Sequence, residues 1–184
     1  FRRVLFRSAQ RLTANQSNET RSGFTPDGSR IVFESDREGL RNLWSMRPDG
    51  SDLRQLTDLD APFNLASVGN FRGKPVAFLE TSAEGDLYRS PRPYVLGLDL
   101  PEGSVGTPVR MHDAFGGAAS ASADGAKVLF ERGTSPWLRR GYTGSDNRDV
   151  WLFDAGSGGF TQLTRHAGND GRASRLVQLE QVLT

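Results

Sequence analysis

The sequence predicts an all-β fold made of repeated four-stranded antiparallel sheets. The stretch 22–57 alternates short apolar runs with turn-forming pairs, which is typical of four short strands joined by tight reversals. The same unit then returns, and Phe33, Phe78 and Phe130 mark a period of about 45–50 residues. A single four-stranded sheet cannot cover its own faces, so such units stack around a central channel. The pattern therefore predicts a partial β-propeller with three whole blades and partial ones beside them.

The expected blades lie at about 19–57, 63–110 and 116–164. The second strands of these blades read Ile-Val-Phe-Glu at 31–34, Val-Ala-Phe-Leu-Glu at 76–80 and Val-Leu-Phe-Glu at 128–131. Fourth strands end in Gln-Leu-Thr at 55–57 and 162–164, and a similar run at 10–13 reads as the last strand of a preceding blade. Trp44 and Trp151 occupy the same strand of different blades, which favours a packing role.

The connections between strands lie on two opposite rims of the stacked sheets, because consecutive strands run in opposite directions. On one rim the turns are short and contain Gly, as in the Asp-Gly pairs at 27–28, 49–50 and 124–125, where the Asp side chain is expected to hydrogen-bond nearby backbone. On the other rim the connections between second and third strands lengthen along the chain, from 35–41 to 81–93 to 133–148. Long loops carry binding chemistry more often than tight turns, so the second rim is the candidate binding surface.

A family resemblance rests on specific phrases. The run Phe-Thr-Pro-Asp-Gly-Ser-Arg-Ile-Val-Phe at 24–33, followed by Ser-Asp-Arg-Glu-Gly at 35–39, resembles the WD40-like repeat of TolB and tricorn-protease propellers. Motifs at 131–133, 139–142, 149–154 and 162–166 are similar, in that order, to the amino-terminal propeller of tricorn-like serine peptidases. The resemblance covers roughly residues 10–170.

The resemblance implies a non-catalytic propeller that guides or binds peptide substrates for a separate protease domain. That domain and its PDZ neighbour would lie elsewhere in the parent protein, so the parent is expected to be a serine peptidase and this chain alone is expected to hydrolyse nothing. Two alternatives stay open. One is a TolB-like protein-interaction scaffold of the bacterial envelope, and the other is the propeller of a prolyl-oligopeptidase-type enzyme. The expected compartment is the periplasm rather than the cytoplasm.

Candidate binding residues lie on the second rim. The loop 133–148 holds two arginines between two aromatic residues, a combination able to grip a peptide carboxylate or backbone: Trp137, Arg139, Arg140 and Tyr142. The alternative is that these side chains pack and pair to anchor a long loop. His112 and His166 also fall on this rim, each three residues after an equivalent strand position, Val109 and Leu163.

Other chemistry finds no support in the sequence. No Gly-x-Ser-x-Gly elbow, His-Glu-x-x-His motif or phosphate-binding loop is present, and two equivalent histidines suggest repeat structure rather than a catalytic triad. The chain has no Cys and its carboxylate-rich loop at 145–149 lacks calcium-loop spacing, so no metal or cofactor is expected. No apolar run approaches the length of a membrane helix.

Neither end of the sequence repeats the four-strand pattern in full. Residues 1–8, Phe-Arg-Arg-Val-Leu-Phe-Arg-Ser, read like a translated sequencing adapter, and without their three arginines the formal charge of +1 becomes negative. The balance of charge therefore gives no reason to expect nucleic-acid binding, and the expected partners are peptides or proteins. Residues 171–184 read as a tail or as the start of a further blade.

Overall fold

The computed structural model describes residues 11–84, 90–135, 144, 146–166 and 168–171, which form three four-stranded antiparallel sheets without a helix. The first sheet contains β1 (Glu19–Phe24), β2 (Ile31–Ser35), β3 (Asn42–Met46) and β4 (Arg54–Gln55). The second contains β5 (Asn64–Phe71), β6 (Lys74–Thr81), β7 (Arg92–Gly97) and β8 (Val109–Arg110). The third contains β9 (Gly117–Ala121), β10 (Lys127–Arg132), β11 (Asp149–Asp154) and β12 (Phe160–Gln162).

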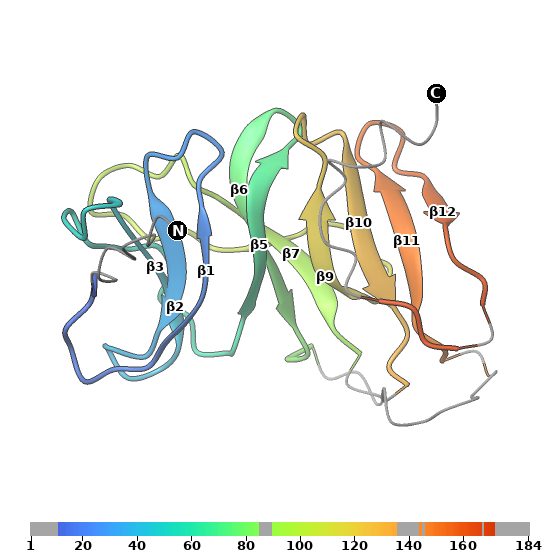
Figure 1. The fold of residues 1–184 in the computed structure, drawn as a ribbon, viewed down its shortest axis with the longest axis horizontal. Helices are drawn as coiled ribbons and strands as arrows, with labels where there is room; N and C mark the ends of the chain where they lie inside the picture. The colour runs from blue at the N-terminus through green and yellow to red at the C-terminus, as the bar shows by residue number, and fades with distance from the viewer. Residues whose placement is uncertain (1–10, 85–89, 136–143, 145, 167, 172–184) are drawn as a thin grey trace, which may run out of the picture.

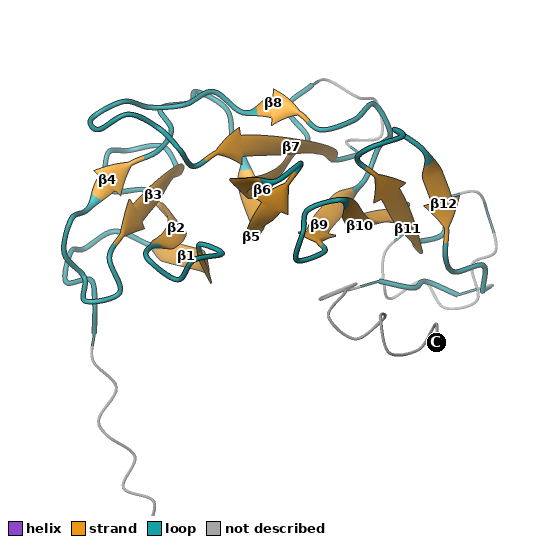
Figure 2. Cartoon of the chain, turned by 90° about the horizontal axis from the view of Figure 1, so that it is seen from above, coloured by secondary structure: helices purple, strands orange, loops and turns teal. Residues whose placement is uncertain are grey.

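The three sheets stand side by side in chain order (Figure 1). Seen from above they form an arc, with β1, β5 and β9 on the concave side and β4, β8 and β12 toward the convex side (Figure 2). This is how neighbouring blades lie in a propeller, whose first strands face the central channel. The prediction of an all-β partial propeller is confirmed.

Short turns fix the strand pairing on one rim. The Asp27 carboxylate accepts hydrogen bonds from the Thr25 hydroxyl at 2.6 Å and the Ser29 N–H at 3.0 Å, and Asp124 accepts the same pair of contacts from Ser122 and Ala126. These contacts confirm the predicted structural use of the Asp-Gly pairs. Gly28, with φ of +70°, supplies the left-handed backbone that the turn requires.

We call this side of the arc the turn rim, because it holds the β1–β2, β5–β6 and β9–β10 turns and the β3–β4, β7–β8 and β11–β12 turns. Arg72 shows that turns of both kinds and of different sheets meet there. Its N–H donates to Gly125 O at 3.2 Å, and its Nε donates to Ala155 O at 3.1 Å. The opposite side, where β2, β6 and β10 end and the long loops begin, is the loop rim.

The hydrophobic core lies between the sheets. One cluster joins the second and third sheets, with Phe78 and Phe130 both 0% exposed. A second cluster joins the first and second sheets and includes Val32, Leu43 and Leu79. Burying one large apolar side chain stabilises the fold by about 1.5–3 kcal/mol, so these two interfaces hold the sheets together.

The tryptophans pack as the sequence predicts. Trp44 is buried beside Phe33 and Met46, and the Arg37 guanidinium lies over its ring at 4.7 Å from the centroid. Trp151 is half-buried against the cluster between the second and third sheets, with Arg132 5.2 Å from its ring centroid.

Two elements differ from the prediction. Residues 11–14 lie in no strand, although Leu12 still packs on the outer face of the first sheet. The fourth strands are also shorter than expected, since β4 and β8 have two residues each. Within the described ranges there is no helix long and apolar enough to span a bilayer.

Candidate functional site

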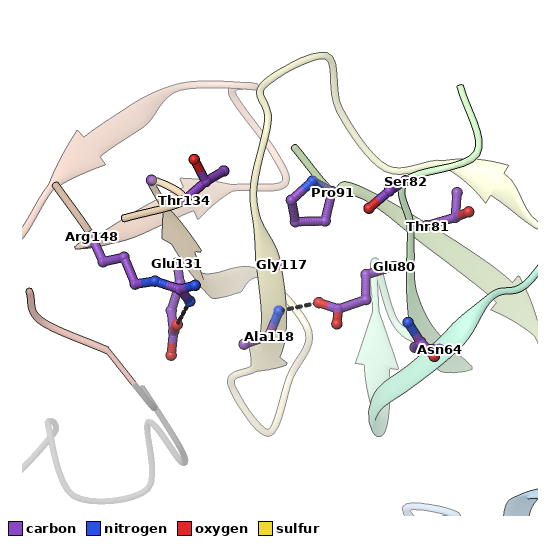
Figure 3. A pocket seen from close by; sticks show the side chains of 11 residues that line it. Asn64, Glu80, Thr81, Ser82, Pro91, Gly117, Ala118, Glu131, Thr134 and Arg148 are labelled. Atoms are coloured by element: carbon purple, nitrogen blue, oxygen red, sulfur yellow. Dashed lines mark hydrogen bonds and ion pairs between the residues drawn. The ribbon is translucent and has the colours of Figure 1, made fainter. Parts of the chain in front are cut away.

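A cavity of about 320 Å³ opens on the loop rim between the second and third sheets (Figure 3). Its walls come from the ends of β6 and β10, the starts of β5 and β9, and the bases of two long loops. The lining is mostly polar and includes both charge signs: Asn64, Glu80, Thr81, Ser82, Pro91, Gly117, Ala118, Glu131, Gly133, Thr134 and Arg148. The cavity thus lies on the rim that the loop lengths favour for binding.

Glu80 closes the inner side of this cavity. Its Oε2 accepts a hydrogen bond from the backbone N–H of Ala118, the second residue of β9, at 2.7 Å. A Cβ on Gly117 would come within 2.3 Å of the same oxygen, so a side chain at this position would displace the carboxylate from its present place. The carboxylate therefore links the second sheet to the main chain of the third.

Backbone irregularity positions that N–H group. The β9–β10 pairing shifts register between Leu129 and Glu131, and Ala118 has a φ of 54°. A β-bulge of this kind turns a backbone group away from the ladder. The first sheet has the same feature at Arg21, with a φ of 43° and a register shift between Thr20 and Ser22.

Arg148 and Glu131 form the opposite wall. The Arg148 Nη1 lies 3.7 Å from Glu131 Oε2, and its Nε donates to the Ser135 carbonyl at 2.8 Å. Thr134 is held as well, because its N–H and hydroxyl both donate to the Asp146 carboxylate, at 2.9 and 2.6 Å. The two ends of the longest loop are therefore fixed side by side at the cavity.

Four of the predicted binding residues lie outside the described residues: Trp137, Arg139, Arg140 and Tyr142. The described bases of their loop, Gly133, Thr134 and Arg148, do line the cavity. Their assignment as binding residues stays a prediction.

His112 packs inside the aromatic cluster of the third sheet. Its ring lies 4.7 Å from both Phe130 and Phe153 and 5.0 Å from Phe160, measured between centroids. Neither ring nitrogen has a hydrogen-bond partner among the described residues. Burial lowers the pKa of His112 to about 4, because a charged imidazolium would lose its hydration there.

His166 has a different environment despite its equivalent place in the repeat. It is exposed, its Nδ1 accepts a hydrogen bond from the Gly168 N–H at 3.0 Å, and its carbonyl accepts one from Asn147 Nδ2. The repeat predicts the place of both histidines in the chain, but the aromatic residues of the third sheet enclose only His112.

Glu80, Glu131 and Arg148 are not among the binding residues predicted from the sequence. A signal was present, because each second strand carries Glu near its end: Glu34, Glu80 and Glu131. Among the described residues no three His, Asp or Glu side chains gather closely enough to hold a metal ion.

Comparison with known proteins places the fold. No protein-family model matches the chain. An uncharacterized protein of Agrobacterium fabrum, Atu1656, is 27% identical over 133 residues, which cover 66% of this chain and 42% of that protein. The chain therefore spans less than half the length of this relative.

Solved structures agree on the architecture. A putative TolB from Agrobacterium tumefaciens superposes with a TM-score of 0.57 at 20% identity, over 83% of this chain and 51% of that one. TolB from Acinetobacter baumannii superposes with a TM-score of 0.54 at 21% identity, over 78% of this chain and 31% of that one. The tricorn protease superposes with a TM-score of 0.31 at 13% identity, over 87% of this chain and 18% of that one. The chain has a TolB-like fold of the β-propeller type.

Proposed function

We propose that the chain is a non-catalytic propeller module that binds peptide segments on its loop rim. The observation that carries this proposal is the cavity between the second and third sheets, whose wall includes both ends of the longest loop. A ligand seated in the cavity would contact the two sheets and the loop 133–148 together. The candidate residues Trp137, Arg139, Arg140 and Tyr142 belong to that loop.

The size and charge of the cavity favour a peptide. Small-molecule pockets usually measure about 300–1,000 Å³, so 320 Å³ suits one or two amino-acid residues of a longer ligand. Glu80 lies on one wall and the Glu131–Arg148 ion pair on the facing wall, and backbone groups of Gly117 and Gly133 also line the cavity. Such a lining matches the alternating donors and acceptors of a peptide backbone.

Two candidates remain for the full-length protein to which this chain belongs. A tricorn-like role, in which the propeller guides peptides toward a separate serine-protease domain, follows from the motifs at 131–166. A TolB-like scaffold that binds protein partners in the envelope is the second candidate, and the fold similarity to two TolB structures favours it. The reading frame beyond this chain would distinguish these candidates. A PDZ and protease segment would support the tricorn-like role, and a stop after the propeller would support the TolB-like scaffold. A domain with a Gly-x-Ser-x-Gly motif would indicate a prolyl-oligopeptidase-type enzyme.

Peptide binding is tested by fluorescence anisotropy with labelled extended dodecapeptides that carry either a free or an amidated carboxyl end. Ser82→Trp fills the mouth of the cavity from an exposed position, and we expect it to weaken binding at least about tenfold. Ser29→Trp makes the same change at an exposed position on the turn rim and should leave the affinity unchanged.

Arg139→Ala and Arg140→Ala test the loop, with Lys74→Ala on the turn rim as the control. A desolvated charge-assisted hydrogen bond is worth about 1.5–3 kcal/mol, so each loop variant should weaken binding roughly 10- to 150-fold if its guanidinium holds the ligand. Loss for the free carboxyl end alone would identify a carboxylate site. Unchanged affinity in Ser82→Trp and in both arginine variants, with folding verified by circular dichroism, would refute the proposal.

A further inference from the structure

A second cavity, of about 370 Å³, opens between the first and second sheets beside β1 and β5, the strands on the concave side of the arc (Figure 2). Its lining includes Arg21, Ser22, Ser67, Glu80 and Ala118. Glu80 and Ala118 also line the loop-rim cavity (Figure 3). The two cavities therefore adjoin at the contact between the Glu80 carboxylate and the Ala118 N–H.

The cavity lies where a contact between neighbouring sheets differs from its equivalent. Between the second and third sheets, the Ser67 hydroxyl donates to the Ala119 carbonyl of β9 at 2.6 Å. Ser67 directly follows the register shift of β5, and Ser22 directly follows that of β1. Ser22 is nevertheless exposed and lines the cavity. The first two sheets thus leave open, on the concave side, a place that a serine bridges in the next interface.

Arg21 gives this cavity a positive charge. It lies at the register shift of β1, and its φ of 43° is uncommon for a residue other than glycine. The corresponding residues of the second and third sheets are Ala66 and Ala118, so only the first of the three sheets has a charged side chain there. The Arg21 side chain is 46% exposed.

The guanidinium of Arg21 is held only loosely. Its Nη1 lies 3.9 Å from Glu34 Oε1 and 3.9 Å from Glu80 Oε1, which is longer than a hydrogen bond. Both carboxylates have closer donors, namely the Leu65 N–H for Glu34 at 2.5 Å and the Ala118 N–H for Glu80 at 2.7 Å. Long ion pairs of a half-exposed arginine contribute little to stability, so its N–H groups are available to a ligand.

We propose that this cavity binds a carboxylate of a peptide ligand through Arg21, with the Ser22 hydroxyl beside it. A guanidinium presents its N–H groups as a planar fork that matches the two oxygens of a carboxylate. The inference rests on the proposed function, because a peptide seated in the loop-rim cavity reaches this one by passing Glu80. The negative charges of Glu34 and Glu80 oppose an acidic ligand, so its affinity depends on their charge as well as on Arg21.

An NMR titration of the full chain tests the proposal through the Arg21 Nε–H signal and the Ser22 amide. The first pair of probes is an acetylated and amidated pentapeptide, Ala-Ala-Asp-Ala-Ala, and the same peptide with Asn in place of Asp. The second pair is acetylated penta-alanine with a free or an amidated carboxyl end. We expect the carboxylate member of at least one pair to bind at least about fivefold more tightly than its neutral partner. The pair that shows the preference tells whether the carboxylate comes from a side chain or from the chain end.

Three variants separate binding from packing. Arg21→Gln should remove the preference for the carboxylate, and Arg21→Lys should keep part of it, because an ammonium group cannot bind both oxygens in the same planar way. Glu80→Gln should raise the affinity for the carboxylate probe at least about twofold, since the amide oxygen still accepts the Ala118 N–H while the opposing charge is gone. The control is Arg47→Gln, at an exposed arginine on the turn rim that lies 3.6 Å from Asp52, and it should leave the preference unchanged.

The proposal is overturned if neither pair of probes shows a preference, or if the preference persists in Arg21→Gln. Weaker binding of the carboxylate probe by Glu80→Gln would assign the cavity to cationic groups and would also overturn it. Ser82→Trp separates this inference from the proposed function. If Ser82→Trp weakens dodecapeptide binding but no carboxylate preference exists, only the present inference fails. If the preference depends on Arg21 but dodecapeptide binding ignores the loop-rim variants, only the proposed function fails.

Discussion

Replacing His112 by Phe should change how the stability of the protein depends on pH. In the folded protein His112 is neutral down to about pH 4, whereas in the unfolded chain it binds a proton below its ordinary pKa of 6.5. The unfolded state therefore holds more protons between these two values, so the stability attributable to His112 is fully present above pH 6.5 and is lost as the pH falls toward 4. Phe cannot take up a proton, and its ring fits the place between Phe130, Phe153 and Phe160.

The size of the pKa shift sets an upper limit on the pH-dependent stability difference between the wild type and His112→Phe. A pKa lowered from 6.5 to about 4 corresponds to an upper limit of about 3.4 kcal/mol. Because His112 is only half-buried and water screens part of the effect, we expect about 1–2 kcal/mol. Urea unfolding of the wild type and His112→Phe at pH 7.5, 5.5 and 4.5 should show this difference growing in favour of the variant as the pH falls.

The matched control is His166→Phe, which changes the exposed histidine at the equivalent position of the repeat. If the free energy of unfolding changes with pH in the same way in the wild type and in His112→Phe, then the pKa of His112 is not lowered in the folded protein. The same variant serves the binding assay. Unchanged peptide affinity in His112→Phe would assign His112 to packing, and a loss of affinity would support its predicted contact with the ligand.

Three further outcomes are expected. Gly117→Ala should lower the free energy of unfolding in urea by about 1–3 kcal/mol, because the added methyl group displaces Glu80 from the Ala118 N–H. The control Gly69→Ala gains only an ordinary 3.5 Å contact and should lower it less, so equal losses would contradict the steric argument. In an NMR titration the Asp27 carboxyl should show a pKa of about 2, because hydrogen bonds from the Thr25 hydroxyl, and to a smaller extent from the Ser29 N–H, stabilise its charged form. Thr25→Val should raise that pKa toward 3.8, and an unchanged pKa would show that Thr25 is not the main cause. The purified chain should show no peptidase turnover, and hydrolysis that survives purification and is abolished by changing a single serine would refute its non-catalytic role.

The fold was predictable because its signals are local. Asp-Gly pairs specify the turns, alternating runs specify the strands, and their recurrence specifies the stacking of sheets. The lengths of β4 and β8 were less predictable, since an outer strand ends where its neighbour stops offering partners rather than at a particular residue. Residues 11–13 show the same limit, because a strand-like sequence forms a strand only where it pairs with another strand.

The sequence indicates the rim on which the candidate cavity lies but not the residues that line it. Loop lengths indicate the loop rim, and the cavity lies there. The burial of His112 depends on three phenylalanines, all of which follow it in the chain, so no local pattern predicts it. The Glu80 contact likewise depends on how closely two sheets approach, which the sequence records only as a glycine at 117 and a glutamate that ends a strand.

The contacts of Glu34 and Glu80 show how the same link between sheets can form although the residue that donates the hydrogen bond differs. Their donors are backbone N–H groups, so Leu65 in one interface and Ala118 in the next serve equally well, while the acceptor is Glu each time. A carboxylate bound to a main-chain N–H makes a stronger hydrogen bond than a neutral pair and needs no matching side chain on the next sheet. Apolar clusters between the sheets supply most of the stabilisation, and the glutamate contact adds a directional link between the same sheets. The rim cavity lies directly beside such a contact, so the same carboxylate that aligns two sheets also shapes the wall of the proposed binding site.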